Sequence, residues 1–283
     1  MKSFFFVPAV AISAVLMLTA MAGAITGNYD RMAWLAAALA NLPLPFFYLR
    51  LKFARVPRTS GDLPLSILIS AGASVVALWQ AVLAQSAGWQ PVAVALAGTT
   101  LLLLYVFWYS KFGRAPNARL EIRNRLPQFE LTDLDGRPVK SSEFLGAPSV
   151  WLFYRGNWDP FCVAQIHEIA GRQADLEKLG ARLNLVSSQP VDRVRELSSE
   201  LGASLNFLFD RDARAASALD ISERHPIPLG TAGDFAPVGA MPTVIVTNAS
   251  GTILFTDQTD NYRVRPEPDI YISILRRAGA VAR

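Results

Sequence analysis

The only cysteine in the 283-residue chain is Cys162, in the stretch YRGNWDPFCVAQ at 154–165. It follows a continuous apolar run, SVWLFY at 149–154, and precedes VAQIHEIAGRQADLEKLGA at 163–181, whose apolar positions have helical spacing up to a terminal glycine. A cysteine in the first turn of a helix faces free N–H groups and the partial positive charge of the helix end. Both stabilise the thiolate, which is the nucleophilic form of the side chain. The pattern therefore predicts a reactive thiol at Cys162.

Four neighbours of Cys162 bear on its chemistry. A carboxylate at Asp159, three residues earlier, raises the pKa of the thiol if the two are close, whereas a protonated Asp159 would donate a hydrogen bond to a peroxide. The guanidinium of Arg155 adds positive charge, Pro160 shapes the helix start, and Trp158 is expected to pack at the pocket. A buried, unreactive thiol is the alternative interpretation, because free cysteine is a common core residue.

A single cysteine excludes an intramolecular disulfide, so an oxidised Cys162 must be resolved by an external thiol or a second chain. The only histidines, His167 and His225, have no metal-ligand spacing, and we expect no metal. No phosphate loop or dinucleotide glycine motif is present, so we expect no cofactor. Without a long basic run, we expect no nucleic-acid partner despite a net charge of +4.

The N-terminal half has the composition of a membrane protein. Charged residues are nearly absent from 3–29 and 63–110, while 114–283 has an ordinary soluble composition. A membrane-spanning helix needs about 20 apolar residues. Four stretches meet or nearly meet this requirement, at 4–26, 32–49, 64–86 and 90–109. We therefore expect a transmembrane region over 1–113, a linker over 114–125 and a soluble domain over 126–283.

Basic residues near the apolar stretches predict the orientation. One side carries Lys2, Arg50, Lys52, Arg55, Arg58, Lys111, Arg114 and Arg119. The loops on the opposite side contain a single basic residue, Arg31. We expect both ends of the chain in the cytoplasm and the helices in the inner or plasma membrane. None of the spans has an ionisable residue in its middle, which favours an anchor over a transporter.

The first stretch has an alternative interpretation as a signal peptide, since Lys2 and an apolar run precede the small-residue sequence Ala20-Met21-Ala22. Cleavage there would leave three spans and keep the C-terminal domain on the same side.

The C-terminal half alternates short apolar runs with amphipathic stretches. We expect strands at 149–154, 182–188, 205–210, 242–248 and 252–257, and helices at 163–181, 191–203, 212–219 and 268–279. This order predicts a parallel sheet with an antiparallel addition, covered by helices. Gln165 is expected to be a solvated helix residue, and Asp210 and Asp212 to lie on a solvated turn.

The stretch FELTDLDGRPVKSSEFLGAPSVWLFYRGNWDPFC resembles the opening of peroxiredoxin and related redoxin domains of the alkyl hydroperoxide reductase and thiol-specific antioxidant (AhpC/TSA) group. The resemblance covers roughly 125–275 and implies a thioredoxin fold with Cys162 as the redox cysteine. MPT at 241–243 resembles the loop of that fold in which a cis-proline faces the cysteine, and this implies that Pro242 and Thr243 line the pocket. The family's facing arginine is not evident, and Arg155, Arg263 and Arg265 remain the candidates.

The resemblance implies a membrane-anchored peroxidase that reduces hydroperoxides through a sulfenic acid on Cys162, with Asp159 and Arg155 shaping the pocket. Its partners would be a hydroperoxide, an external thiol reductant and the lipid bilayer, with a homo-oligomer also open. Two alternatives stay open. One is a redoxin-fold binding or scaffold module without turnover, favoured if an ionised Asp159 lies beside the sulfur. The other is a glutathione or mixed-disulfide reductase.

Overall fold

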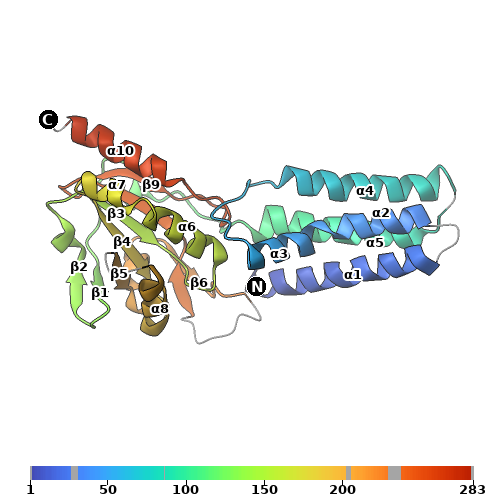
Figure 1. Ribbon diagram of the computed structural model, residues 1–283, viewed down its shortest axis with the longest axis horizontal. Helices are drawn as coiled ribbons and strands as arrows, with labels where there is room; N and C mark the ends of the chain where they lie inside the picture. The colour runs from blue at the N-terminus through green and yellow to red at the C-terminus, as the bar shows by residue number, and fades with distance from the viewer. Residues whose placement is uncertain (1, 27–30, 86, 202–204, 229–236, 282–283) are drawn as a thin grey trace. The chain divides into compact units, whose positions relative to one another are not determined.

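The computed structural model describes residues 2–26, 31–85, 87–201, 205–228 and 237–281. It divides into two compact units (Figure 1). One holds the described residues of 1–54 and 59–111. The other holds Arg55–Arg58, 112–227 and the described residues after 231. The segment Arg55–Arg58 of the basic 50–63 loop therefore belongs to the C-terminal unit.

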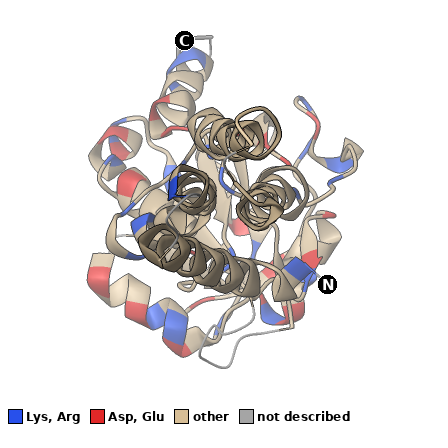
Figure 2. Cartoon of the chain, turned by 90° about the vertical axis from the view of Figure 1, so that its right-hand side faces the viewer, with Lys and Arg blue, Asp and Glu red and all other residues tan. Residues whose placement is uncertain are grey.

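The first unit is helical. Its helices are α1 (Phe6–Thr26), α2 (Arg31–Asn41), α3 (Pro43–Phe53), α4 (Pro64–Val82) and α5 (Trp89–Leu104), which continues as a π-helical turn over Tyr105–Tyr109. Four segments are long and apolar enough to cross a membrane, namely Lys2–Thr26, Arg31–Phe53, Pro64–Val82 and Trp89–Tyr109. In Figure 2 the helices of this unit, seen nearly end-on, carry almost no coloured charged residues. The expectation of about four candidate spans is confirmed.

The second candidate span is interrupted between α2 and α3, where Pro43 cannot donate a helical hydrogen bond. The polar groups at this break find partners inside the bundle. The amide of Asn41 donates to the carbonyls of Ala37 at 2.9 Å and Val94 at 3.0 Å, and Ser13 Oγ donates to the Asn41 carbonyl at 2.9 Å. Such internal pairing is what a hydrocarbon environment demands of a broken helix.

The second unit is built on a seven-stranded sheet with the order β2-β1-β5-β4-β3-β8-β9. The strands are β1 (Glu130–Thr132), β2 (Pro138–Lys140), β3 (Ser149–Phe153), β4 (Arg182–Ser187), β5 (Asn206–Phe209), β8 (Thr243–Thr247) and β9 (Ile253–Asp257). The three central strands β3, β4 and β5 pair in parallel, and the outer strands are antiparallel. All five residues of β3 are buried, as a central strand covered on both faces requires.

The two faces of the sheet carry different layers. Side chains of α6 (Pro160–Ala170), α7 (Gln173–Lys178), α8 (Val191–Leu201) and α10 (Pro268–Val281) share one core with Val150 and Leu152 of β3. The alternate residues Trp151 and Phe153 join a second core with α9 (Arg214–Ala218) and 3₁₀ turns at Ala118–Leu120, Ser141–Phe144 and Arg211–Ala213. This α/β arrangement confirms the thioredoxin-like fold implied by the sequence.

Three local features differ from the sequence-based expectation. The helix expected over 163–181 is two helices, because Gly171 ends α6 and Arg172 leaves helical geometry before α7 begins. The side chain of Arg172 pairs with Asp175 and Asp269, which holds the break. A separate hairpin of β6 (Ser222–Arg224) and β7 (Val238–Ala240) was not expected. Short polar strands such as SER carry no apolar alternation to indicate them.

The third difference concerns Pro242. Among the described residues no peptide bond is cis, so the expected cis-proline is wrong in this structure. Next to it, the Met241 N–H donates to the Ile221 carbonyl at 2.7 Å, and Thr243 begins β8.

Candidate active site around Cys162

Cys162 lies in the first turn of α6, just beyond the carboxyl end of β3. Asp159 is the N-cap residue of this helix, and its Oδ1 accepts hydrogen bonds from the backbone N–H groups of Phe161 at 3.0 Å and Cys162 at 3.4 Å. Pro160 occupies the first helical turn, where its missing N–H costs nothing. The sequence Asp-Pro-Phe-Cys thus fixes where the helix starts and sets the thiol beside the capping carboxylate.

The loop between β3 and α6 is held by paired amides. Gly156 adopts φ +149°, and a Cβ at that position would lie 2.8 Å from the Gln189 Oε1. That oxygen accepts from the backbone N–H of Asn157 at 2.8 Å, and the Gln189 amide donates to Asn157 Oδ1 at 2.8 Å. The loop therefore needs glycine where the Gln189 side chain approaches.

Two buried charged groups lie next to the sulfur of Cys162, the carboxylate of Asp159 and the guanidinium of Arg265. Cys162 Sγ donates to Asp159 Oδ2 at 3.2 Å. Nη2 of Arg265 lies 3.9 Å from the sulfur and 3.8 Å from the same carboxylate oxygen. The exposed fractions are 0% for Cys162, 1% for Asp159 and 4% for Arg265. Because the ion pair is out of water, its charges act on the thiol at close range with little screening.

The pKa of the Cys162 thiol is raised well above its ordinary value. Burial is the largest cause, because it disfavours the charged thiolate, and the negative charge of Asp159 adds to it. The positive charge of Arg265 and a hydrogen bond from the backbone N–H of Arg155 act in the opposite direction but are outweighed. At neutral pH the resting thiol is therefore protonated, with its proton directed at the carboxylate.

Arg155 is near Cys162 through its backbone, while its side chain is engaged elsewhere. Its Nε and Nη2 donate to the carboxylate of Glu223 at 2.9 and 2.5 Å. Its guanidinium also lies over three aromatic rings, those of Phe112, Trp158 and Tyr262, at 5.1–5.7 Å from their centroids. Trp158 accordingly packs against Arg155 beside the helix start. The arginine that faces the sulfur of Cys162 is instead Arg265, one of the three candidates named from the sequence.

Arg265 is fixed by contacts of its own backbone and of its neighbours. Arg58 donates from Nε to the Arg265 carbonyl at 3.1 Å and pairs with Glu168 of α6. Tyr271 of α10 donates to the Pro266 carbonyl at 3.1 Å. The segment carrying Arg265 is therefore tied to both α6 and α10.

Gln165 contacts Tyr271, which holds the segment that carries Arg265, although the sequence predicted that Gln165 would be solvated. It is 2% exposed, and its amide donates to the Tyr271 hydroxyl at 3.2 Å. The expectation was wrong because α10 covers this face of α6, a long-range contact that helical spacing alone does not reveal.

Asp210 was also expected in solvent and is instead fully buried. Its carboxylate oxygens accept from the backbone N–H groups of Ala215 at 2.8 Å and Ala216 at 2.9 Å, capping α9. Burial raises its pKa, with these hydrogen bonds partly opposing the rise. Asp212 is exposed, as expected for a solvated turn.

Pro242 and Thr243 are held by Arg114, which the sequence indicated only as a linker residue and as one of the basic residues that set the orientation. Arg114 donates from Nη2 to the Pro242 carbonyl at 2.6 Å and from Nη1 to Thr243 Oγ1 at 3.1 Å. Burial, together with the charge of nearby Arg265, lowers the pKa of Arg114 to about 10. The residue still carries its charge at neutral pH and adds positive potential on the Arg265 side of the site.

Comparison with known proteins bears on this domain alone. Residues 122–256 match the model of the AhpC/TSA family. The C-terminal unit is therefore similar to redoxin domains of the AhpC/TSA family. The match contains β3, Asp159, Cys162 and β8, and it ends before Arg265. No curated protein matches the chain.

Solved structures similar to the redoxin domain include peroxidoxin BcpB from Mycobacterium tuberculosis, at 19% identity and a TM-score of 0.47, with 56% of this chain and 97% of that chain covered. AhpC from Enterococcus faecalis is 16% identical with a TM-score of 0.47, covering 57% of this chain and 93% of that chain. A peroxiredoxin 6 variant from Arenicola marina is 14% identical with a TM-score of 0.48, covering 58% and 75%.

The burial of Cys162 leads to a direct prediction. In the folded chain at pH 7, alkylation of Cys162 by iodoacetamide is expected to be at least about 100-fold slower than in the urea-unfolded chain, because burial and the charge of Asp159 keep the native thiol protonated. Mass spectrometry of the single labelled cysteine gives both rates. Equal rates would show that the first turn of α6 is open in solution and that this closed geometry is not the resting state.

Proposed function

We propose that the protein is a membrane-anchored thiol peroxidase whose only redox group is Cys162. The AhpC/TSA match supports redoxin chemistry in the C-terminal domain. The observation that carries the finer proposal is the contact of Cys162 Sγ with Asp159 Oδ2 at 3.2 Å, with Arg265 next to both groups. This geometry offers a way to form a thiolate although burial raises the pKa of the thiol.

Cys162 and Asp159 form a coupled pair with one proton between them. Removing that proton to water would leave two negative charges in a buried site. Burial is the larger cause of the raised pKa of the thiol, and the charge of Asp159 adds to it. Moving the proton from sulfur to the carboxylate leaves the total charge of the pair unchanged. The positive charge of Arg265 compensates the single negative charge of the pair, whether that charge is on the sulfur of Cys162 or on the carboxylate of Asp159. The thiolate tautomer therefore forms without a second uncompensated charge.

The proposed oxidation step uses both members of the pair. The sulfur of Cys162 attacks the terminal oxygen of a hydroperoxide ROOH, forming an S–O bond as the O–O bond breaks. The carboxylic acid of Asp159 gives its proton to the departing alkoxide, which leaves as ROH. Cys162 becomes a sulfenic acid and Asp159 returns to its carboxylate, so two electrons pass from sulfur to the peroxide.

Regeneration needs an external thiol, because the sequence holds no second cysteine. A thiol R′SH condenses with the sulfenic acid, releasing water and forming a mixed disulfide with Cys162. A second R′SH attacks the outer sulfur, which releases R′SSR′ and restores the Cys162 thiol. The reductant is thus proposed to be a low-molecular-weight or protein thiol, and a homo-oligomer stays a prediction.

The proposal is tested by the rate of Cys162 sulfenic acid formation in the purified full-length chain, with hydrogen peroxide and an organic hydroperoxide. We expect rates at least about 100-fold above that of free cysteine at pH 7, the size of effect typical of positioned acid–base catalysis. Cys162→Ser is the control and should abolish the signal. Dithiothreitol should restore the thiol between cycles. A rate equal to that of free cysteine would reject the peroxidase.

A second candidate is a redoxin-fold binding or scaffold module without turnover. The burial of Cys162 and the raised pKa of its thiol favour it. It predicts that Cys162 is oxidised no faster than free cysteine in the same experiment. Rapid thiol exchange with glutathione disulfide but no peroxide preference would instead support a mixed-disulfide reductase.

The proposed topology has four spans, with the redoxin domain in the cytoplasm. Its support is the four apolar helical segments and the basic residues of the 50–63 loop and the 111–119 segment. A fluorescent protein that folds only in the cytoplasm, fused after Arg283, is expected to be bright, and a periplasm-active phosphatase fused at the same point is expected to be inactive. The opposite pair of results would reverse the orientation, and a free soluble chain would reject anchoring.

A further inference from the structure

Arg58 lies in the loop between two candidate spans, but it belongs to the C-terminal unit and its side chain contacts residues of that unit. Its Nε donates to the backbone carbonyl of Arg265 at 3.1 Å. Its Nη2 pairs with the carboxylate of Glu168 on α6, and its Nη1 lies 3.8 Å from Glu267 Oε1. The side chain of Arg58 is only 25% exposed, so these charged contacts are screened less than those of a surface pair.

Two hydrogen bonds hold the backbone of the segment that carries Arg265. Tyr271 donates to the Pro266 carbonyl at 3.1 Å, and Arg58 donates to the carbonyl of Arg265 itself. Arg58 also pairs with α6, whose first turn contains Cys162. The planar guanidinium of Arg58 therefore joins the backbone of Arg265 to the helix that carries the sulfur, in a fixed geometry.

The position of the Arg265 guanidinium determines how strongly its charge acts on the sulfur. Its Nη2 lies 3.9 Å from Cys162 Sγ and 3.8 Å from Asp159 Oδ2, and all three residues are buried. The positive charge of Arg265 opposes burial and the Asp159 charge, which raise the pKa of the thiol. Because an arginine side chain has many rotamers, fixing its backbone restricts where the guanidinium can lie.

We infer that Arg58 is a positioning residue of the redox site, which holds Arg265 beside Asp159 and Cys162. The inference rests on the proposed function, in which Arg265 compensates the charge of the Cys162–Asp159 pair. Both Arg58 and Arg265 lie outside residues 122–256, which match the AhpC/TSA family, so the match does not assign this role. The loop whose basic residues predict the membrane orientation thus has a second role, in the chemistry of the thiol.

The test begins with Arg58→Met in the full-length protein in detergent, because methionine keeps an apolar stem and removes the donors and the charge. A displaced Arg265 should slow oxidation of Cys162 by hydroperoxide at least about tenfold, since small misplacements in an active site have large effects on rate. Alkylation by iodoacetamide should begin to accelerate at higher pH than in the native chain. At a given pH it should be about tenfold slower for each unit by which the pKa of the thiol rises.

A second variant separates positioning from a direct effect of charge. Glu168→Gln combined with Glu267→Gln removes both carboxylates that pair with Arg58. The direct effect of losing two negative charges would lower the pKa of the thiol, whereas releasing Arg58 should raise it. We expect the second result, with oxidation at least about threefold slower. These side chains are 33% and 63% exposed, so this variant serves even if Arg58→Met does not fold.

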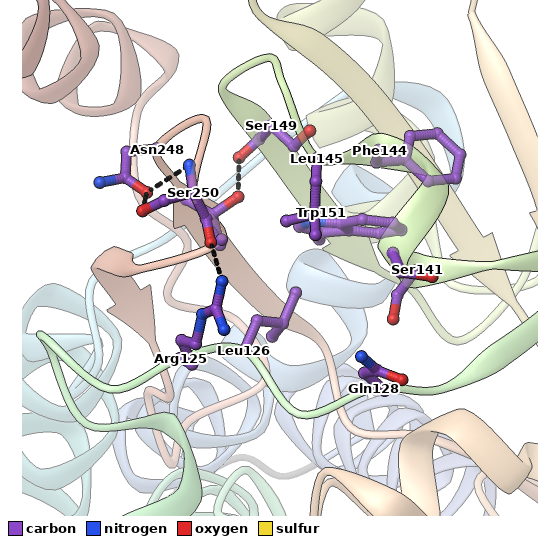
Figure 3. A pocket seen from close by; sticks show the side chains of 13 residues that line it. Arg125, Leu126, Gln128, Ser141, Phe144, Leu145, Ser149, Trp151, Asn248 and Ser250 are labelled. Atoms are coloured by element: carbon purple, nitrogen blue, oxygen red, sulfur yellow. Dashed lines mark hydrogen bonds between the residues drawn. The ribbon is translucent and has the colours of Figure 1, made fainter.

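Two arginines provide matched controls. Arg55 lies in the same loop and pairs with Glu200 of α8 at 3.1 Å, away from the sulfur. Arg125 donates to a backbone carbonyl, as Arg58 does, but its acceptor is Ser250 at 3.4 Å in a separate pocket of the C-terminal unit (Figure 3). Arg55→Met and Arg125→Met should leave the oxidation rate and the pH dependence of alkylation unchanged.

The remaining outcomes decide against the inference. An unchanged oxidation rate and alkylation profile in Arg58→Met, or alkylation that accelerates at lower pH in the variant with two glutamines, would overturn it. Faster alkylation of Arg58→Met at every pH, with the same pH dependence, would overturn it too and assign Arg58 to the stability of the domain. If the native chain is oxidised no faster than free cysteine, the proposed peroxidase fails, and the alkylation profiles still decide whether Arg58 positions Arg265.

Discussion

Replacing Asp159 by asparagine is expected to move two reactions of Cys162 in opposite directions. Removing the negative charge lowers the pKa of the thiol, so alkylation at pH 7 should become about tenfold faster for each pKa unit recovered. The same change removes the group that takes the thiol proton and returns it to the leaving alkoxide. Oxidation by hydroperoxide should therefore become about 100-fold slower, within the range for loss of a general acid. Stopped-flow oxidation and iodoacetamide labelling measure the two rates.

The pH profile gives an independent reading of this substitution. Because burial and the Asp159 charge both raise the pKa of the native thiol, alkylation of the native chain should increase only above the usual range for cysteine. In Asp159→Asn the increase should begin at lower pH. An asparagine side chain also caps helices well, so α6 is expected to keep its start.

Asp210→Asn is the matched control, since Asp210 is another buried carboxylate that caps a helix, away from the sulfur. It should leave both rates of Cys162 unchanged. If Asp159→Asn instead accelerates oxidation in parallel with alkylation, the carboxylate merely suppresses the thiol. That result would favour the binding-module alternative over the peroxidase.

The sequence predicted the framework of the redoxin domain well because its signals are local. Runs such as 149–154 and 242–248 are apolar throughout, as buried strands must be, and the structure has strands at Ser149–Phe153 and Thr243–Thr247. The four apolar stretches likewise became four candidate spans. The β6–β7 hairpin was missed because its short polar strands carry no apolar alternation, and the helix break at Gly171 because it is held in part by the distant Asp269.

Only the site residues that lie close to one another in the sequence could be predicted. Spacing alone brings Asp159 to Cys162, because an N-cap residue and the third residue of its helix are always close. Arg265 is more than 100 residues away and remained one of three candidates until the fold was known. Arg114 had no local signal, since its role depends on where the Pro242 carbonyl points. Long-range partners of this kind are set by the sheet order, which composition and periodicity do not specify.

Replacing Arg265 by methionine is expected to destabilise the redoxin domain by about 3–5 kcal/mol, because it leaves the carboxylate of Asp159 buried without its counter-charge. The native pair is 3.8 Å apart, and both side chains are 2% exposed. The urea dependence of Cys162 labelling in the full-length chain measures the effect, since the only cysteine becomes accessible when the domain opens. Arg193→Met, which breaks an exposed pair on α8, is the control and should cost at most about 1 kcal/mol.

The double variant Asp159→Asn with Arg265→Met decides why the single change is costly. If the cost comes from an uncompensated buried charge, removing both charges should restore much of the lost stability, and the two effects will be strongly non-additive. If the two costs simply add, Arg265 stabilises the domain through its packing rather than through Asp159. The Cys162–Asp159 pair would then lack the counter-charge on which its single shared proton depends, and the proposed oxidation step would fail with it.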